Sequence, residues 1–152
     1  MAFHPRPFAQ RPLPGFTRVA FRWLEKLGWR SHASDDVLGP RGENLAAKFL
    51  RNRGYKIILR NFRCDVGEID IIAKEGRTLV FVEVKTRVND DVQPEEQVNA
   101  TKQHQITKAA RFYLSRYGMP QPPARFDVIG IIWPKGRQPR IQHTPDAFEA
   151  TF

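Results

Sequence analysis

Cysteine is almost absent from this chain of 152 residues, in which Cys64 is the only one. One thiol cannot form an internal disulfide, and no Cys and His residues stand at the spacing of a zinc site. Such sparse cysteine is typical of a reducing compartment, so we expect a cytoplasmic protein without a zinc site. Long apolar runs are also missing. Residues 128–134 are enough for one strand only, so we expect no membrane-spanning segment.

Acidic residues are scarce relative to basic ones. The chain has 25 Lys and Arg against 16 Asp and Glu, which gives a formal net charge of +9. A surface this basic attracts polyanions and steers them on arrival, which favours a nucleic acid or an anionic lipid as partner. The length is sufficient for one domain with an apolar core of its own.

The first 34 residues differ in composition from the rest. They hold six Lys or Arg and one acid, and four prolines interrupt their first half. The pattern predicts a basic arm over 1–34 that carries a short amphipathic helix over 17–29, followed by an α/β domain over 37–152. The arm could contact phosphates, dock on a partner or membrane, or act in targeting.

Within the domain, apolar periodicity and turn residues predict a mixed sheet packed against helices. Pro40 is placed in the first turn of the first helix, and Gly54 follows its end. The second and third strands form a hairpin around residues 75–77. The expected elements, in chain order, are a helix over 40–53, strands over 55–62, 68–74 and 78–87, a helix over 95–117 with acids in its first turn, and strands over 126–133 and 140–143.

Three charged residues interrupt the apolar hairpin: Asp70, Glu83 and Lys85. Strand alternation places Glu83 and Lys85 on one face with Phe81, and Asp70 on one face with Ile72. A two-residue turn sets Asp70 opposite Phe81, and a slip by two residues sets it opposite Glu83. In either register the two carboxylates share a face, about 5–8 Å apart.

Two neighbouring carboxylates repel each other and lose hydration, and a divalent cation relieves both costs. Carboxylate oxygens suit Mg²⁺ or Mn²⁺, and Lys85 could orient or deprotonate an attacking water. The alternative is structural: Glu83 and Lys85 form a cross-strand ion pair, and Asp70 belongs to a turn.

Ile69-Asp70 followed by Glu83-Val84-Lys85 resembles the P-D…(D/E)-x-K signature of the restriction-endonuclease-like superfamily, with Ile69 in place of the proline. The wider pattern over residues 39–150 resembles the YraN-like family within that superfamily. Its matching positions are Gly42-Glu43, Gly54-Tyr55, Arg60-Asn61, Gly67-Glu68-Ile69-Asp70, Phe81-Val82-Glu83-Val84-Lys85, Lys102, Arg125-Phe126-Asp127 and Ala147-Phe148.

The resemblance implies a central mixed sheet between helices. It also implies metal binding by Asp70, Glu83 and the Val84 carbonyl, and a relation to archaeal-type Holliday-junction resolvases. The YraN-like group has no settled activity of its own, so fold and site are implied more firmly than the reaction.

Four further polar residues are expected either near the site or away from it. Glu43 either faces the metal site or complements the helix dipole. Lys102 interrupts an apolar stripe and either snorkels out of the helix or faces the scissile phosphate beside Lys85. Asp127 is expected to pair with an arginine rather than a metal, and His143 is expected on the surface.

Basic residues gather around the first predicted helix, and we expect them to contact the nucleic-acid backbone. They are Arg41, Lys48, Arg51, Arg53 and Lys56, and Lys102 of the second predicted helix is expected to contact it too. No base-reading motif is present, so recognition by nucleic-acid shape is favoured.

The sequence therefore predicts a Mg²⁺- or Mn²⁺-dependent nuclease that acts on structured or single-stranded DNA, more readily than on RNA. Asp70 and Glu83 would hold the metal, Lys85 would assist the water, and Glu43 and Lys102 would support them. Two alternatives stay open: a nucleic-acid-binding module that does not cut, and a protein that docks on a partner or membrane through its arm. A homodimer is also open.

Overall fold

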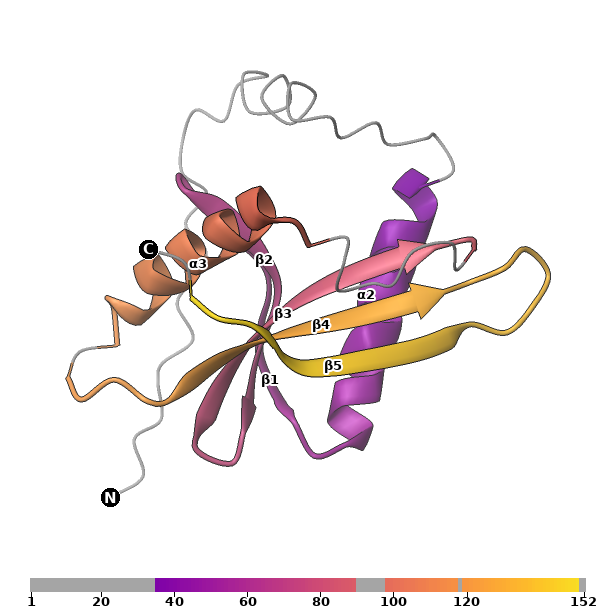
Figure 1. The fold of residues 1–152 in the computed structure, drawn as a ribbon. Coiled ribbons are helices and arrows are strands. Elements are labelled where there is room, and N and C mark those ends of the chain that lie inside the picture. Colours follow the sequence, from indigo (N-terminus) through magenta and orange to yellow (C-terminus); the bar gives the residue numbers. More distant parts are fainter. Residues whose placement is uncertain (1–34, 90–97, 118, 151–152) are drawn as a thin grey trace, which may run out of the picture. The chain divides into compact units, whose positions relative to one another are not determined.

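A computed structural model describes residues 35–89, 98–117 and 119–150, which form two helices and five strands (Figure 1). The predicted arm, with its helix over 17–29, lies outside these residues. In chain order the elements are α2 (Asp35–Asn52), β1 (Lys56–Cys64), β2 (Gly67–Glu75), β3 (Thr78–Arg87), α3 (Ala100–Leu114), β4 (Ala124–Ile132) and β5 (Arg140–Phe148).

The five strands form one mixed sheet in the order β1-β2-β3-β4-β5. β3 and β4 are parallel, and every other neighbouring pair is antiparallel. Parallel neighbours need a long crossover connection, and α3 lies in the connection between β3 and β4. The predicted α/β class and mixed sheet flanked by helices are confirmed, in an arrangement consistent with a restriction-endonuclease-like fold.

Successive side chains of β3 belong alternately to two separate apolar cores. Val80 and Val82 pack with Ala46 and Leu50 of α2. Phe81, between them, packs with Ile106 and other residues of α3. Because successive strand residues point to opposite faces, the two helices cover opposite faces of the sheet.

The first helix begins at Asp35, so Pro40 lies inside it, and the prediction that Pro40 marks its first turn is wrong. Proline is tolerated near a helix start because the first four backbone N–H groups have no helical partner, but this helix extends one further turn. The predicted stop is confirmed. Gly54 has φ 86°, Gly54 N donates to Arg51 O, and Tyr55 N donates to Leu50 O, both at 3.0 Å. This is the hydrogen-bond pattern of a Schellman motif.

The helix predicted over 95–117 is shorter than expected. The Asn99 side chain accepts a hydrogen bond from Lys102 N and caps the first turn, so α3 begins at Ala100 with no acid in that turn. At the other end, α3 stops at Leu114, and Ser115 forms the cap. Residues 95–97, with their two acids, lie outside the described residues.

The last strand is longer than the predicted 140–143 and continues to Phe148. Pro145 interrupts the sequence pattern, but β5 lies at the sheet edge, where a missing backbone donor is tolerated. A register shift against β4 and a positive φ of 52° at Asp146 accommodate the irregular backbone. Among the described residues, no helix has both the length and the apolar character needed to span a bilayer.

Gly42 brings α2 close to β3, and its substitution tests this packing. A Cβ on Gly42 would lie 1.8 Å from Thr86 Oγ1, whereas a Cβ on Gly39 would meet nothing within 4 Å outside its chain neighbours. We expect Gly42→Ala to lower the free energy of unfolding by about 1–3 kcal/mol, measured by urea denaturation.

Gly39→Ala on the same helix is the matched control. Its gain in helix propensity is offset by the contact with Pro40, so the change should stay below about 1 kcal/mol. Equal effects of the two substitutions would contradict the close approach of α2 to β3 at Gly42.

Candidate functional site

The register of the β2–β3 hairpin brings the predicted acids to the same place. Residues 76 and 77 form the turn, and pairing runs from Glu75 with Thr78 to Ile71 with Val82. Continuing this register by one residue puts Asp70 opposite Glu83, so the second of the two predicted registers is the observed one. Ile72 and Phe81, each two residues away, both face the α3 side. The two carboxylates therefore belong to that side of the sheet.

Asp70 is held by the backbone of the neighbouring strand and lies close to other acids. Its Oδ2 accepts a hydrogen bond of 2.7 Å from Val84 N. The pKa of the Asp70 carboxyl is raised well above its usual value, first by burial and then by the negative charge of Glu83. The Val84 hydrogen bond and the charge of Lys102 act in the opposite direction, and the charge of Glu43 raises the pKa further.

Glu83 is 2% exposed, and its two oxygens have different surroundings. Oε1 lies 2.8 Å from Lys85 Nζ and 3.4 Å from Lys102 Nζ. Oε2 is buried and has no hydrogen-bond partner within the described part of the chain. A buried carboxylate oxygen without a partner is costly, and this atom is free to accept a hydrogen bond or a metal ion.

Lys102 comes from α3, on the opposite side of the cluster from the hairpin strands. Its side chain is only 13% exposed, and its Nζ also lies 3.7 Å from Glu68 Oε1. Burial tends to lower the pKa of Lys102, but Glu83, Asp70 and Glu68 outweigh burial and raise it, which keeps the ammonium group charged. Lys102 therefore faces the carboxylates and does not snorkel into solvent.

The structure brings together four of the residues predicted for the site: Asp70, Glu83, Lys85 and Lys102. The fifth, Glu43, comes from α2, and its charge acts on Asp70. Of the structural alternative, only the ion pair of Glu83 with Lys85 is confirmed. The pair lies within β3 and does not cross strands, and Asp70 lies in β2 and not in a turn. Glu68 was not predicted for the site, although it shares the alternation of Asp70 two residues before it.

The site could hold a divalent cation through few protein ligands. Within the described ranges there is no group of three or more His, Cys, Asp and Glu side chains placed to hold a metal ion. Mg²⁺ is commonly held by one or two carboxylates together with water and substrate phosphate. The free Oε2 of Glu83 beside Asp70 fits that type of ligand set.

The other basic residues predicted for nucleic-acid binding are exposed on and after α2. The Arg41 guanidinium lies 4.5 Å from the centre of the Trp133 ring, and that of Arg53 lies 4.3 Å from the centre of the Phe49 ring. The basic residues extend as far as Arg53, which is ten residues from Glu43 in the chain. Ten residues correspond to about 15 Å along a helix axis. The surface comprises Arg41, Lys48, Arg51, Arg53 and Lys56, whereas Lys102 belongs to the carboxylate cluster.

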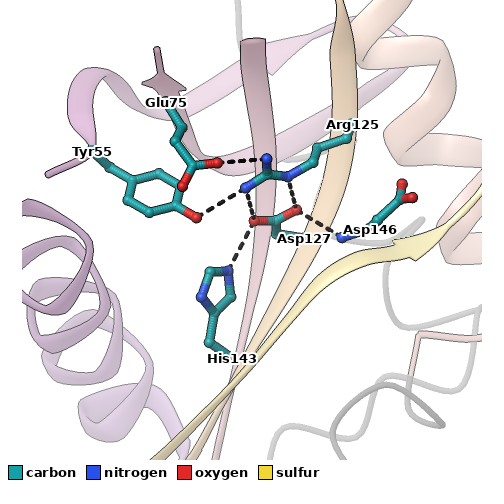
Figure 2. Close-up of polar contacts among 6 residues, drawn as sticks. All are labelled: Tyr55, Glu75, Arg125, Asp127, His143 and Asp146. Atoms are coloured by element: carbon teal, nitrogen blue, oxygen red, sulfur yellow. Dashed lines mark hydrogen bonds and ion pairs between the residues drawn. The ribbon is translucent and has the colours of Figure 1, made fainter. Parts of the chain in front are cut away.

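A second polar cluster is centred on Asp127, which is fully buried (Figure 2). Oδ1 accepts hydrogen bonds from Arg125 Nε at 2.9 Å and Asp146 N at 3.0 Å. Oδ2 lies 2.9 Å from His143 Nε2 and 3.2 Å from Arg125 Nη2. Burial tends to raise the pKa of Asp127, but the hydrogen bonds from His143, Arg125 and Asp146 outweigh it and lower that pKa.

The predicted pairing of Asp127 with an arginine is therefore confirmed, and the surface placement of His143 is wrong. The His143 side chain is 6% exposed, and its ring makes edge contacts with Phe49 and Tyr55. Arg125 extends the cluster to Glu75 at 2.6 Å and to the Tyr55 hydroxyl at 2.9 Å. These contacts have no local signal in the sequence, since they join residues up to 70 positions apart.

Comparison with known proteins places the chain in a family. The model of the uncharacterised protein family UPF0102 matches residues 42–131, which include Asp70, Glu83, Lys85, Lys102 and Asp127. The chain belongs to this family. The resemblance to YraN-like proteins is thus confirmed at the level of the family.

Relatives from several bacteria match over nearly their whole length. A UPF0102 protein of Geobacter sulfurreducens is 50% identical over 127 residues, which are 83% of this chain and 98% of the relative. One of Geotalea uraniireducens is 46% identical over 121 residues, 79% of this chain and 95% of the relative. One of Thermodesulfovibrio yellowstonii is 46% identical over 112 residues, 73% of this chain and 95% of the relative.

Asp127 should make the fold sensitive to acid. Because its folded-state pKa is lowered, its stabilising effect is present above the unfolded value of about 3.9 and is lost as the pH falls through the folded value. We expect Asp127→Asn to lower the free energy of unfolding by about 3 kcal/mol at pH 7, since it leaves Arg125 without its main partner. The difference from the wild type should shrink at pH 3.

Urea denaturation at the two pH values measures both effects. Asp65→Asn, at an exposed turn position, is the matched control and should change the free energy by less than about 0.5 kcal/mol. A loss for Asp127→Asn that is as large at pH 3 as at pH 7 would contradict the electrostatic origin.

Proposed function

We propose that this protein is a Mg²⁺- or Mn²⁺-dependent nuclease that hydrolyses phosphodiester bonds in DNA. The single observation that carries the proposal is the buried Oε2 of Glu83, which has no hydrogen-bond partner among the described residues, next to a second, partly buried acid, Asp70. A family of restriction-endonuclease type, related to archaeal-type Holliday-junction resolvases, would account for both the mixed sheet and this acid pair. We also propose that the protein acts in the cytoplasm.

Asp70 and Glu83 would hold the metal ion, with the Val84 carbonyl as a third ligand. The Val84 N–H already fixes one Asp70 oxygen, so the carboxylate is oriented by the backbone of β3. When bound, the ion would lower the pKa of a water molecule and offset negative charge on the phosphate. The repulsion that raises the pKa of Asp70 supports this assignment, because a cation would relieve it.

Lys85 and Lys102 would act on the substrate side of the acids. Both ammonium groups contact the same oxygen of Glu83. Lys85, whose Nζ lies 2.8 Å from Glu83 Oε1, would orient the attacking water. Lys102, which its acidic neighbours keep charged, would stabilise negative charge on the reacting phosphate. Glu43 would support the site from α2.

Binding of DNA would use the basic surface of α2. Its exposed guanidinium and ammonium groups suit contacts with phosphates, which carry no sequence information. A nucleic-acid-binding module that does not cut is the second candidate. It would need this surface but not the acid pair, so the cost of burying Glu83 favours the nuclease.

Metal binding provides a test that is independent of catalysis. We expect Mn²⁺ titration by calorimetry to show binding to the wild type, and at least a tenfold weaker affinity for Glu83→Gln and Asp70→Asn, because a ligand oxygen loses its charge. Asp65→Asn is the control and should bind as the wild type does. Unchanged affinity in Glu83→Gln would refute the metal site.

Cleavage provides the second test, on a panel of branched, flapped, single-stranded and duplex DNA. We expect Glu83→Gln to abolish Mg²⁺-dependent cleavage and yet to bind DNA as tightly as the wild type or more tightly, because repulsion of phosphate falls. Lys85→Ala should keep the metal ion and lose about 10²–10³-fold in rate, the scale of removing one charge-stabilising group. If the wild type cuts no member of the panel, the binding module becomes the better reading.

A further inference from the structure

A chain of aromatic rings leads from the core to the surface at the C-terminal end of α3. Phe81, which is 1% exposed, lies with its ring centre 6.0 Å from that of Tyr113. From Tyr113 the contacts continue to Tyr117 at 5.5 Å and, through Phe62, to Phe112. Phe112 and Tyr117 are 36% and 46% exposed, so anchored rings meet solvent here.

Positive charge surrounds these exposed rings. The guanidinium of Arg116 lies 4.6 Å from the centre of the Phe112 ring. Lys108 and Arg111 are exposed on the preceding turns, and the segment from residue 100 to residue 117 contains no acid. We call Phe112, Arg116 and Tyr117, with the neighbouring Lys108, the aromatic patch.

Flat rings and a planar guanidinium beside cations suit one class of ligand. The faces of nucleic-acid bases stack on aromatic rings and on arginine planes, while the cations bind phosphates. In a duplex these faces are already stacked on one another, so only unpaired bases can use such a surface. An acidic peptide would be held by the cations, but its carboxylates would not stack on the planar groups.

Helix α3 connects the patch to the carboxylate cluster, because Lys108 and Phe112 of the patch and Lys102 of the cluster all lie on it. Lys102, in the cluster, is ten residues before Phe112, which corresponds to about 15 Å along the axis of α3. Lys108 lies between them in sequence. A single strand of nucleic acid held on the patch could therefore follow α3 toward Asp70 and Glu83.

We propose that the aromatic patch binds the unpaired bases of a single-stranded nucleic acid. The inference rests on the proposed function for the nature of the ligand, and it adds which form of nucleic acid is held. Stacking supplies affinity for bases of any sequence, and the adjacent cations supply affinity for the backbone.

Binding is tested with the full chain and a chelator, so that no cleavage is needed. Fluorescence anisotropy compares a labelled oligothymidylate with an abasic strand of the same length and with a duplex. We expect the wild type to bind the oligothymidylate at least about fivefold more tightly than the abasic strand, because the latter has phosphates but no bases to stack.

Variants separate stacking from charge. Phe112→Ala combined with Tyr117→Ala should weaken binding of the oligothymidylate at least about tenfold and leave the abasic strand unaffected. Phe112→Trp should keep the affinity, and Phe112→Leu should lose it, because leucine is apolar but not planar. Met119→Ala is the matched control, since Met119 is apolar and 87% exposed just beyond the patch.

Salt dependence gives a further distinction. The aromatic variants should lower affinity at every salt concentration without changing the slope of log K against log[salt]. Lys108→Ala should reduce the slope by about 0.7, the value for one phosphate contact on a single strand. Urea denaturation checks folding of each variant, and Tyr117→Ala alone serves as the test should Phe112→Ala prove unstable.

Three results would overturn the proposal. One is equal affinity of the wild type for the oligothymidylate and the abasic strand, and another is unchanged affinity in the double aromatic variant. The third is sedimentation that shows self-association of the wild type which the double variant loses, because the patch would then be a contact between copies of the chain. A protein that binds through the patch but never cuts would refute only the nuclease, and one that cuts without using the patch would refute only this inference.

Discussion

A shift of β3 by one residue against β2 would turn Phe81 away from α3 and would place Val80 and Val82 there instead, while Ile72 of β2 kept its side. The side chains that β3 contributes to the two apolar cores would then face the wrong helices. The same shift would separate Asp70 from Glu83. The hydrophobic contacts that stabilise the sheet therefore also hold the two acids together, and a change of register that disrupted the site would disrupt the fold with it.

Burial of Glu83 is the main electrostatic cost in this part of the chain. Two lysines, one from β3 and one from α3, offset its charge through the same oxygen. The second oxygen is buried, and none of the described residues donates a hydrogen bond to it. An apolar side chain of similar size at this position would avoid the cost altogether, so the acid is best explained by what it can bind.

Strand alternation allowed the face of each residue in β3 to be predicted, because the period of two does not depend on distant contacts. The turn sequence allowed two registers of β2 against β3, and only the packed structure selects between them. Prediction from the local sequence failed where a contact with a residue distant in the chain decides the structure. Pro40 was mistaken for a helix start because the preceding turn carries no apolar pattern. His143 was expected in solvent because its partner, Asp127, lies on another strand.

The two polar clusters of the domain differ in one respect that bears on function. Every carboxylate oxygen of Asp127 accepts two contacts, from Arg125, Asp146 and His143, so nothing further is needed to stabilise it. This cluster links β4 and β5 to the β2–β3 hairpin through Glu75 and to the segment between α2 and β1 through Tyr55. Glu83, equally buried, has one oxygen in contact with two lysines and one without a partner among the residues that the structure describes. Since both acids carry the cost of desolvation, full pairing at Asp127 is what a structural role requires. Incomplete pairing at Glu83 is what a ligand site requires, because a fully paired acid would have no oxygen left to offer.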